Sequence, residues 1–178
     1  KGDWAKVAQH YQDYLKKYGR VALPNEEIRA NVQIGVAMWK LNKKADAEKY
    51  FKAATKIWLG GGAAAIEKAS GGDAEKAGKA VAEGSQATAQ ALWYLAEYQF
   101  DAFQKIGFPE IKGKADMKKV NEWAQGPFVK WIEEKGKALK TAEDAVAKVR
   151  ELKAPMWDIS AASRVGVRHG VRAGRRGR

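Results

Sequence analysis

The feature that most constrains this chain is a fixed order of small and large residues over positions 34–54. Small residues recur where two helix backbones could approach closely, and bulky residues recur where side chains could fill the space between them. This order predicts two antiparallel helices joined by a tight turn, over about residues 26–41 and 45–57. The residues that define the hairpin are Ile34, Gly35, Met38, Ala47, Phe51 and Ala54.

In type, order and spacing these residues resemble a tetratricopeptide (TPR) repeat. The match departs from the family at two positions, because Asn31 replaces the usual Trp and Leu59 stands where a Pro often ends the unit. The resemblance implies an all-α fold, an α-solenoid of antiparallel helix hairpins whose concave face binds a peptide or helix of a partner.

The rest of the chain also favours helix, since Ala, Lys, Glu, Gln and Leu are abundant and Pro is scarce. Residues 2–18 are typical of the second helix of a repeat, although an ordinary amphipathic helix would show the same aromatic spacing. A Gly-rich hinge is expected over residues 59–72. Asp73 then suits the start of one long helix, which gives the solenoid an irregular, lengthened central repeat.

Helical spacing resumes from about residue 116 to 152, with a kink or division at Gly126-Pro127, and a further first helix is expected to begin at Trp157. We therefore expect a TPR-like helical domain over residues 1–166, as a fragment of a longer array. The Arg- and Gly-rich residues 167–178 form a basic tail that is expected to be disordered or not native to the fold.

The charge of the chain is uneven. The formal net charge is +12, and six of the nine Arg lie between Arg164 and Arg178. A basic tail together with exposed Trp residues would suit a helical protein that binds nucleic acid, which is the alternative to a protein-binding scaffold. Nucleic acid would then be bound only through the tail.

The sequence contains few patterns that are typical of catalytic or metal-binding sites. The sequence has no Cys, and its only imidazoles, His10 and His169, lack a nearby catalytic constellation. Motifs of metalloproteases, P-loops and serine hydrolases are not found. We therefore expect a non-enzymatic protein without a cofactor, a metal site or a transmembrane segment in this chain.

In the solenoid, the partner-binding groove would be lined by first helices. Apolar and aromatic residues with scattered charge favour an amphipathic segment as the ligand. On the helix over 26–41 the groove residues are expected to be Arg29, Val32, Val36, Trp39 and Lys40. On the long helix they are Trp93, Glu97, Phe100 and Asp101.

Two stretches, residues 2–19 and 151–166, resemble the TPR components of the adventurous gliding motility machinery of myxobacteria. This resemblance implies a scaffold in the periplasm or at the outer membrane, with other envelope proteins as partners; without it, the chain would be cytoplasmic. His169 replaces a Tyr that is usual near the end of these proteins, and the sequence then departs into Arg and Gly.

Overall fold

The computed structural model describes residues 2–113 and 116–173, with side chains as far as residue 164. These residues form helices joined by turns and one longer loop, and no strand occurs among them, so the prediction of an all-α fold is confirmed. The elements are α1 (Trp4–Tyr18), α2 (Pro24–Lys40), α3 (Lys44–Ile57), the π-helical turn η1 (Trp58–Gly62), α4 (Ala63–Ala69), α5 (Ala74–Lys105), α6 (Met117–Trp123), the π-helical turn η2 (Ala124–Phe128), α7 (Val129–Glu151) and α8 (Pro155–Ala173).

Local sequence signals explain where the first helices begin. The carboxylate of Asp3 accepts a hydrogen bond from the Lys6 backbone N–H and caps α1. Pro24 occupies the first position of α2, and the Glu26 carboxylate accepts a hydrogen bond from the Leu23 N–H. α2 ends in a tight turn in which Asn42 adopts a left-handed conformation, with φ 59°.

α2 and α3 form the predicted antiparallel hairpin. A Cβ atom added to Gly35 would lie 2.6 Å from the Phe51 ring, so only glycine permits this approach. Ile34, Ala47, Phe51 and Ala54 are fully buried, and Met38 packs against the same core. The small residues therefore lie between helices, as the sequence predicts.

The chain bends at both glycine clusters of the expected hinge, but the first is not an open linker. Residues 58–62 form the π-helical turn η1, within which Gly61 has φ 97°. α4 follows at once and buries Ile66 completely. Gly71 and Gly72 then adopt left-handed conformations and turn the chain into α5.

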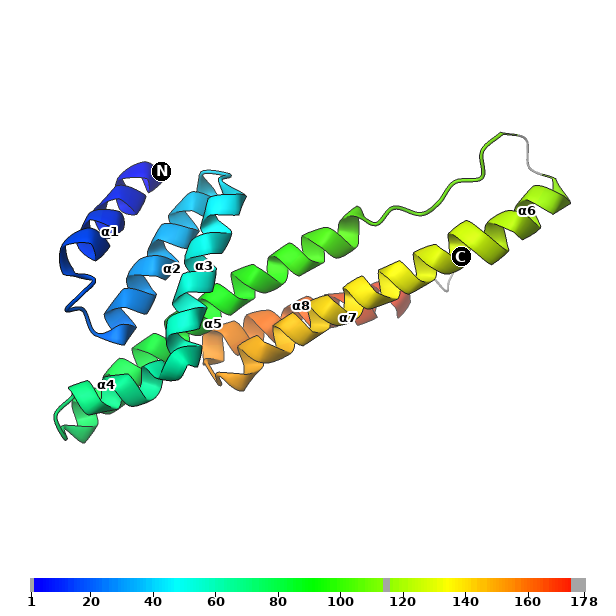
Figure 1. The fold of residues 1–178 in the computed structure, drawn as a ribbon. Helices are drawn as coiled ribbons and strands as arrows, with labels where there is room; N and C mark the ends of the chain where they lie inside the picture. The colour runs from blue at the N-terminus through cyan, green and yellow to red at the C-terminus, as the bar shows by residue number, and fades with distance from the viewer. Residues whose placement is uncertain (1, 114–115, 174–178) are drawn as a thin grey trace.

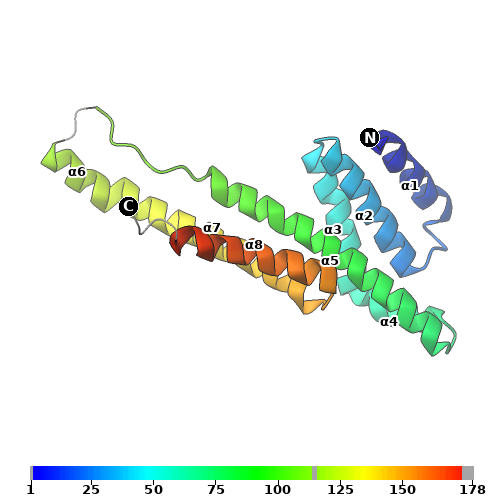
Figure 2. The same cartoon turned by 180° about the vertical axis from the view of Figure 1, so that it is seen from behind.

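α5 is the central helix of the molecule. It spans 32 residues, and Asp73 caps its start as predicted. Figure 1 shows α2 and α3 crossing one side of α5, while α7 and α8 run along the other side, and Figure 2 shows the same arrangement from behind. Each side has its own hydrophobic core. The first contains Ala87 and Ala91 of α5, and the second contains Ala89, Ala96 and Phe100.

α6, η2 and α7 form one nearly continuous run that returns along α5, with Pro127 inside the π-helical turn that replaces the expected kink. The Leu152 carbonyl at the end of α7 accepts a hydrogen bond from the Ser85 hydroxyl of α5. α8 extends to Ala173, past the expected domain boundary at 166–167 and into the stretch that was expected to be a basic tail. Residues 174–178 of that tail lie outside the described residues.

Candidate partner-binding site

The groove expected between residues 26–41 and 93–101 is closed. α2 and α5 pack directly against each other, whereas Glu97 and Phe100 of α5 lie on its other side, toward α7 and α8. Val32 is fully buried and Val36 is 8% exposed, both in the core that also contains Ala87 and Ala91. The expectation that these two valines face a partner is therefore wrong in this structure, because α5 occupies the place of the ligand.

Two aromatic groove residues are also committed to packing. The Trp39 ring contacts Tyr98 edge-on at 5.1 Å between centroids and lies 5.2 Å from Tyr94. Phe100 is 2% exposed, within the core formed with α7 and α8. Phe100 is therefore not available to a partner, and the half-buried Trp39 ring packs on two tyrosines of α5, which stabilises the contact of α5 with α2.

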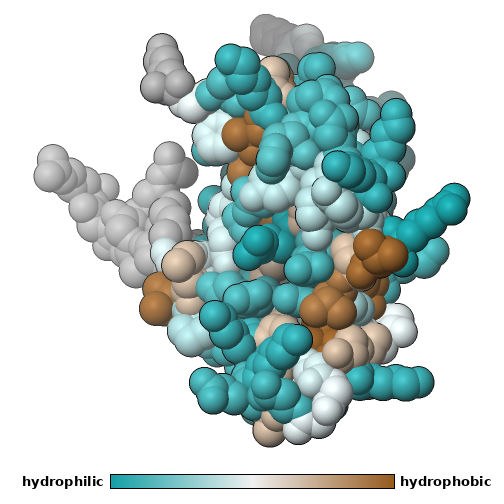
Figure 3. Space-filling view, turned by 90° about the vertical axis from the view of Figure 1, so that its left-hand side faces the viewer, coloured by the Kyte–Doolittle hydropathy of each residue, from teal (hydrophilic) through white to brown (hydrophobic). Residues whose placement is uncertain are grey.

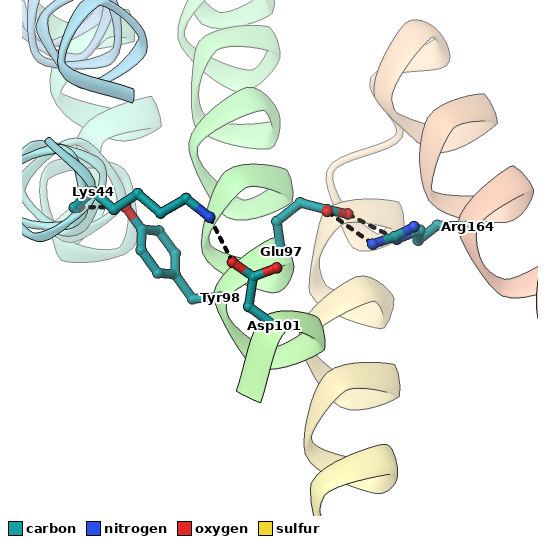
Figure 4. A network of polar contacts seen from close by, with 5 residues as sticks. All are labelled: Lys44, Glu97, Tyr98, Asp101 and Arg164. Atoms are coloured by element: carbon teal, nitrogen blue, oxygen red, sulfur yellow. Dashed lines mark hydrogen bonds and ion pairs between the residues drawn. The ribbon is translucent and has the colours of Figure 1, made fainter. Parts of the chain in front are cut away.

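Polar contacts join the start of α3 to α5 beside the Trp39 ring (Figure 4). Lys44 forms an ion pair of 2.7 Å with Asp101, and its ammonium lies 4.7 Å from the centroid of the Trp39 ring. The Tyr98 hydroxyl donates a hydrogen bond of 2.6 Å to the Lys44 carbonyl. Burial, with help from nearby Glu48 and Asp101, raises the pKa of Tyr98 to about 12. Asp101 is therefore part of this internal contact.

On the opposite side of α5, Glu97 pairs with Arg164 of α8 (Figure 4). The Arg164 Nη2–H donates a hydrogen bond of 2.9 Å to Glu97 Oε2, and Arg164 Nε lies 2.9 Å from Glu97 Oε1 in the same ion pair. The Glu97 side chain is only 15% exposed, and the Arg164 guanidinium also lies 4.8 Å from the Phe100 ring. Glu97 thus holds α8 in place, and the sequence-based groove assignment did not include its partner Arg164.

The two remaining charged residues of the predicted groove, Lys40 and Arg29, lie apart from the other predicted groove residues. Lys40 is exposed at the end of α2. Arg29 is exposed and, with His10 and Tyr14, lines a depression of about 270 Å³ between α1 and α2. In that depression the Tyr14 hydroxyl donates a hydrogen bond of 3.4 Å to Glu26, and burial, followed by the charge of Glu26, raises the Tyr14 pKa.

Trp93, a predicted groove residue on α5, lies at an open surface next to α8. It borders a depression of about 430 Å³ between α5 and α8. The lining residues are Trp93, Ile159, Ser160, Ser163 and Arg164. Ile159 is 71% exposed, and the Trp93 ring lies 5.6 Å from the Trp157 ring. We refer to these five lining residues as the Trp93 depression.

The Trp93 depression combines an apolar floor with hydrogen-bonding groups. The Trp93 indole N–H is buried without a hydrogen-bond acceptor, and the Ser163 residue is exposed at the rim. Sequence reasoning identified Trp93 but missed the α8 side of the depression. A signal was available, because Ile159 and Ser163 are spaced four residues apart and therefore lie on one face of a helix.

Within residues 2–113 and 116–164, no group of three or more His, Asp or Glu side chains could hold a metal ion. None of the helices in the same part of the chain is long and apolar enough to cross a bilayer. Comparison of the chain with protein-family models, with curated proteins and with solved structures finds no match.

Proposed function

We propose that this protein is a non-enzymatic, TPR-like α-solenoid scaffold that binds a helix or peptide of another protein. The close approach of Gly35 to Phe51 supports the repeat-like hairpin, because the resemblance to the TPR family depends on a small residue facing a bulky one at these positions. The irregular central repeat corresponds to α5, whose 32 residues serve both the α2–α3 hairpin and the α7–α8 pair.

The partner binds at the Trp93 depression rather than between α2 and α5. The observation that carries this proposal is the placement of Ile159, 71% exposed, beside the half-buried Trp93 ring at the rim of that depression. An aromatic anchor with an exposed aliphatic neighbour and polar rim groups is the composition of interface hot spots. The ligand is an amphipathic segment whose apolar side chains enter the depression and whose carbonyl or carboxylate oxygens meet Ser163 and Arg164.

A place in a bacterial envelope or motility complex, in the periplasm or at the outer membrane, is part of the same proposal. It rests on the sequence resemblance of residues 2–19 and 151–166. Both stretches belong to helices that form the two ends of the helix stack, α1 and α8, where a further helix or partner could be added.

The experiment is selection of helical peptides from a random library against the full chain, followed by affinity measurement with designed variants. Ile159→Asp places a charge in the depression without opening a cavity, since the side chain is exposed. We expect it to weaken the selected peptides by about tenfold or more, the loss typical of a hot-spot contact. Leu59→Asp is the matched control, because Leu59 is 76% exposed but lies in η1.

Seen from the end that carries α1 and α4, the surface is mostly hydrophilic, with small hydrophobic areas (Figure 3). Equal affinity of the peptides for wild type and Ile159→Asp would reject the Trp93 depression as the site.

If the chain instead binds RNA or DNA with steep salt dependence and loses that binding when Arg175, Arg176 and Arg178 become Gln, the nucleic-acid alternative replaces the scaffold.

A further inference from the structure

The far end of the molecule carries hydrophobic side chains that have no core. α6 and the loop over residues 106–113 project beyond the helix stack, away from α1–α4 (Figure 1). Among the described residues between Phe100 and Ala142, none is buried. We call residues 106–113 and 116–131 the arm. The arm is therefore stabilised by contacts among its own residues and not by the two cores.

A layer of aromatic rings joins the loop to the helices of the arm. Phe108 lies 5.6 Å from Trp123 and 5.1 Å from Trp131, and Phe128 stacks on Trp123 at 5.0 Å between centroids. The Trp123 indole donates a hydrogen bond of 3.1 Å to the Pro109 carbonyl. None of these four rings is buried: Trp123, Phe128 and Trp131 are partly exposed, and Phe108 is mostly exposed.

Two large apolar side chains of the arm are mostly exposed. Phe108 is 58% exposed and Met117, the first residue of α6, is 75% exposed. Exposure of such large apolar side chains to water is unfavourable, and their transfer into an apolar phase lowers the free energy. Two open depressions of about 350 and 370 Å³ lie beside the aromatic layer, one at Trp123 and one at Trp131.

The arm also carries positive charge. Over residues 105–131, which include the arm, the sequence has Lys at six positions against Glu110, Asp116 and Glu122, a formal charge of +3. Lys112 and Lys119 border one depression together with Glu110 and Glu122, and Lys130 borders the other together with Glu134. The nearest acidic partner of Lys118 is Glu122 at 4.0 Å, and both side chains are mostly exposed, so this pair neutralises the ammonium only weakly.

Trp and Phe rings beside Lys at a projecting tip are the composition of surfaces that lie in the interface of a membrane. Trp places its ring at the level of the headgroups, apolar side chains enter the acyl boundary, and Lys extends its ammonium to the phosphates. A soft lipid surface can accommodate a projecting tip, whereas a protein partner would need a matching cavity. The charge of +3 selects anionic headgroups.

We propose that the arm binds the surface of an anionic phospholipid bilayer, with Met117 and Phe108 inserted below the headgroups and the surrounding lysines paired with phosphates. This binding surface is distinct from the Trp93 depression and does not depend on the proposed scaffold function. It attaches the protein to a membrane at its surface, with α6 and the loop over residues 106–113 at the interface.

The test uses the full chain and phosphatidylcholine vesicles, with and without phosphatidylglycerol, in a sedimentation assay. We expect wild type to bind the phosphatidylglycerol vesicles and release them at high salt. Met117→Asp should weaken binding by about tenfold or more, since it removes an apolar group from the bilayer and adds a repelled charge. Met156→Asp is the matched control, because Met156 is 64% exposed near the start of α8, and it should leave binding within about twofold of wild type.

Four results would overturn the proposal. Wild type could fail to bind either vesicle, or Met117→Asp and Met156→Asp could weaken binding equally, which would indicate a general charge effect. Binding could be lost when Arg175, Arg176 and Arg178 become Gln yet persist in Met117→Asp. Finally, sedimentation velocity could show a dimer that only Met117→Asp dissociates, which would assign the arm to a second copy of the chain. Circular dichroism of each variant confirms that the helices remain folded.

Discussion

Gly35 of α2 faces the ring of Phe51 in α3 so closely that a Cβ atom at Gly35 would lie 2.6 Å from one ring carbon and 2.8 Å from the next. Phe51 is fully buried and its ring also stacks on Tyr94 of α5 at 4.7 Å between centroids. The ring therefore cannot move aside without disturbing α5. This contact links the predicted hairpin to the central helix that closes the predicted groove.

Gly35→Ala should consequently destabilise the protein despite the higher helix propensity of Ala. The added methyl group must displace a buried ring, and overpacking of this kind costs about 1–3 kcal/mol. Chemical denaturation measures the change in free energy of unfolding. Gly136→Ala is the control, because a Cβ at Gly136 in α7 meets nothing within 4 Å. There Ala should stabilise by about 0.5–1 kcal/mol. A neutral or stabilising effect of Gly35→Ala would contradict the structure.

The two ion pairs of Figure 4 should differ in their contribution to stability. Arg164→Ala leaves the Glu97 carboxylate, 15% exposed, without its partner, and we expect a loss of about 1–3 kcal/mol. Lys44→Ala removes a pair whose side chains are 44% and 33% exposed, so its loss should be below about 1 kcal/mol. Thermal or denaturant unfolding of the two variants gives the order, and a reversed order would show that α8 is not held through Glu97.

Tyr98 should make the folded state less stable at alkaline pH. Its pKa is raised from 10.0 to about 12 in the folded protein, mainly by burial, so the unfolded chain loses this proton first. The contribution of Tyr98 to the free energy of unfolding is fully present below pH 10 and is lost as the pH rises toward 12. The Tyr94 pKa is raised by burial in the same direction. Denaturant midpoints measured across this range should fall less steeply in Tyr98→Phe than in wild type. Identical slopes would mean that Tyr98 is not in this environment.

Amide hydrogen exchange should separate the arm from the rest of the molecule. Backbone amides of α6 and of residues 129–135 in α7 lie where no described side chain is buried, and we expect them to exchange through local opening. Amides of α5 near Ala89 and Ala96 lie between two cores and should exchange only near the free energy of global unfolding. Equal protection of α6 and the middle of α5 would contradict an arm without a core.

Much of the fold could be predicted because its signals are local. The Asp73 cap and the Gly35–Phe51 spacing are read within a single turn or hairpin, and each lies where the sequence indicates. The extent of α8 was not predicted, because Gly- and Arg-rich composition suggests a tail, whereas its helical backbone continues to Ala173.

The site was predicted poorly because it depends on which helix packs on which. Val36 and Phe100 were assigned to an open groove on the assumption of a regular superhelix, in which first helices face a hollow. α5 is instead apolar on two faces, with Ala87 and Ala91 on one and Ala89 and Ala96 on the other, and a helix of this kind is covered on both. Counting these alanines around the helix would have indicated burial.

The most direct test of the closed α2–α5 contact is a double-mutant cycle on Trp39 and Tyr98, whose rings meet edge-on at 5.1 Å. Unfolding free energies of wild type, Trp39→Ala, Tyr98→Ala and the double variant give the coupling between the two rings. Packing of α5 onto α2 predicts a coupling of about 0.5–1.5 kcal/mol, the value expected for an aromatic pair in contact. Additive losses, with no coupling beyond experimental error, would mean that the two helices do not meet and that an open groove lies between them.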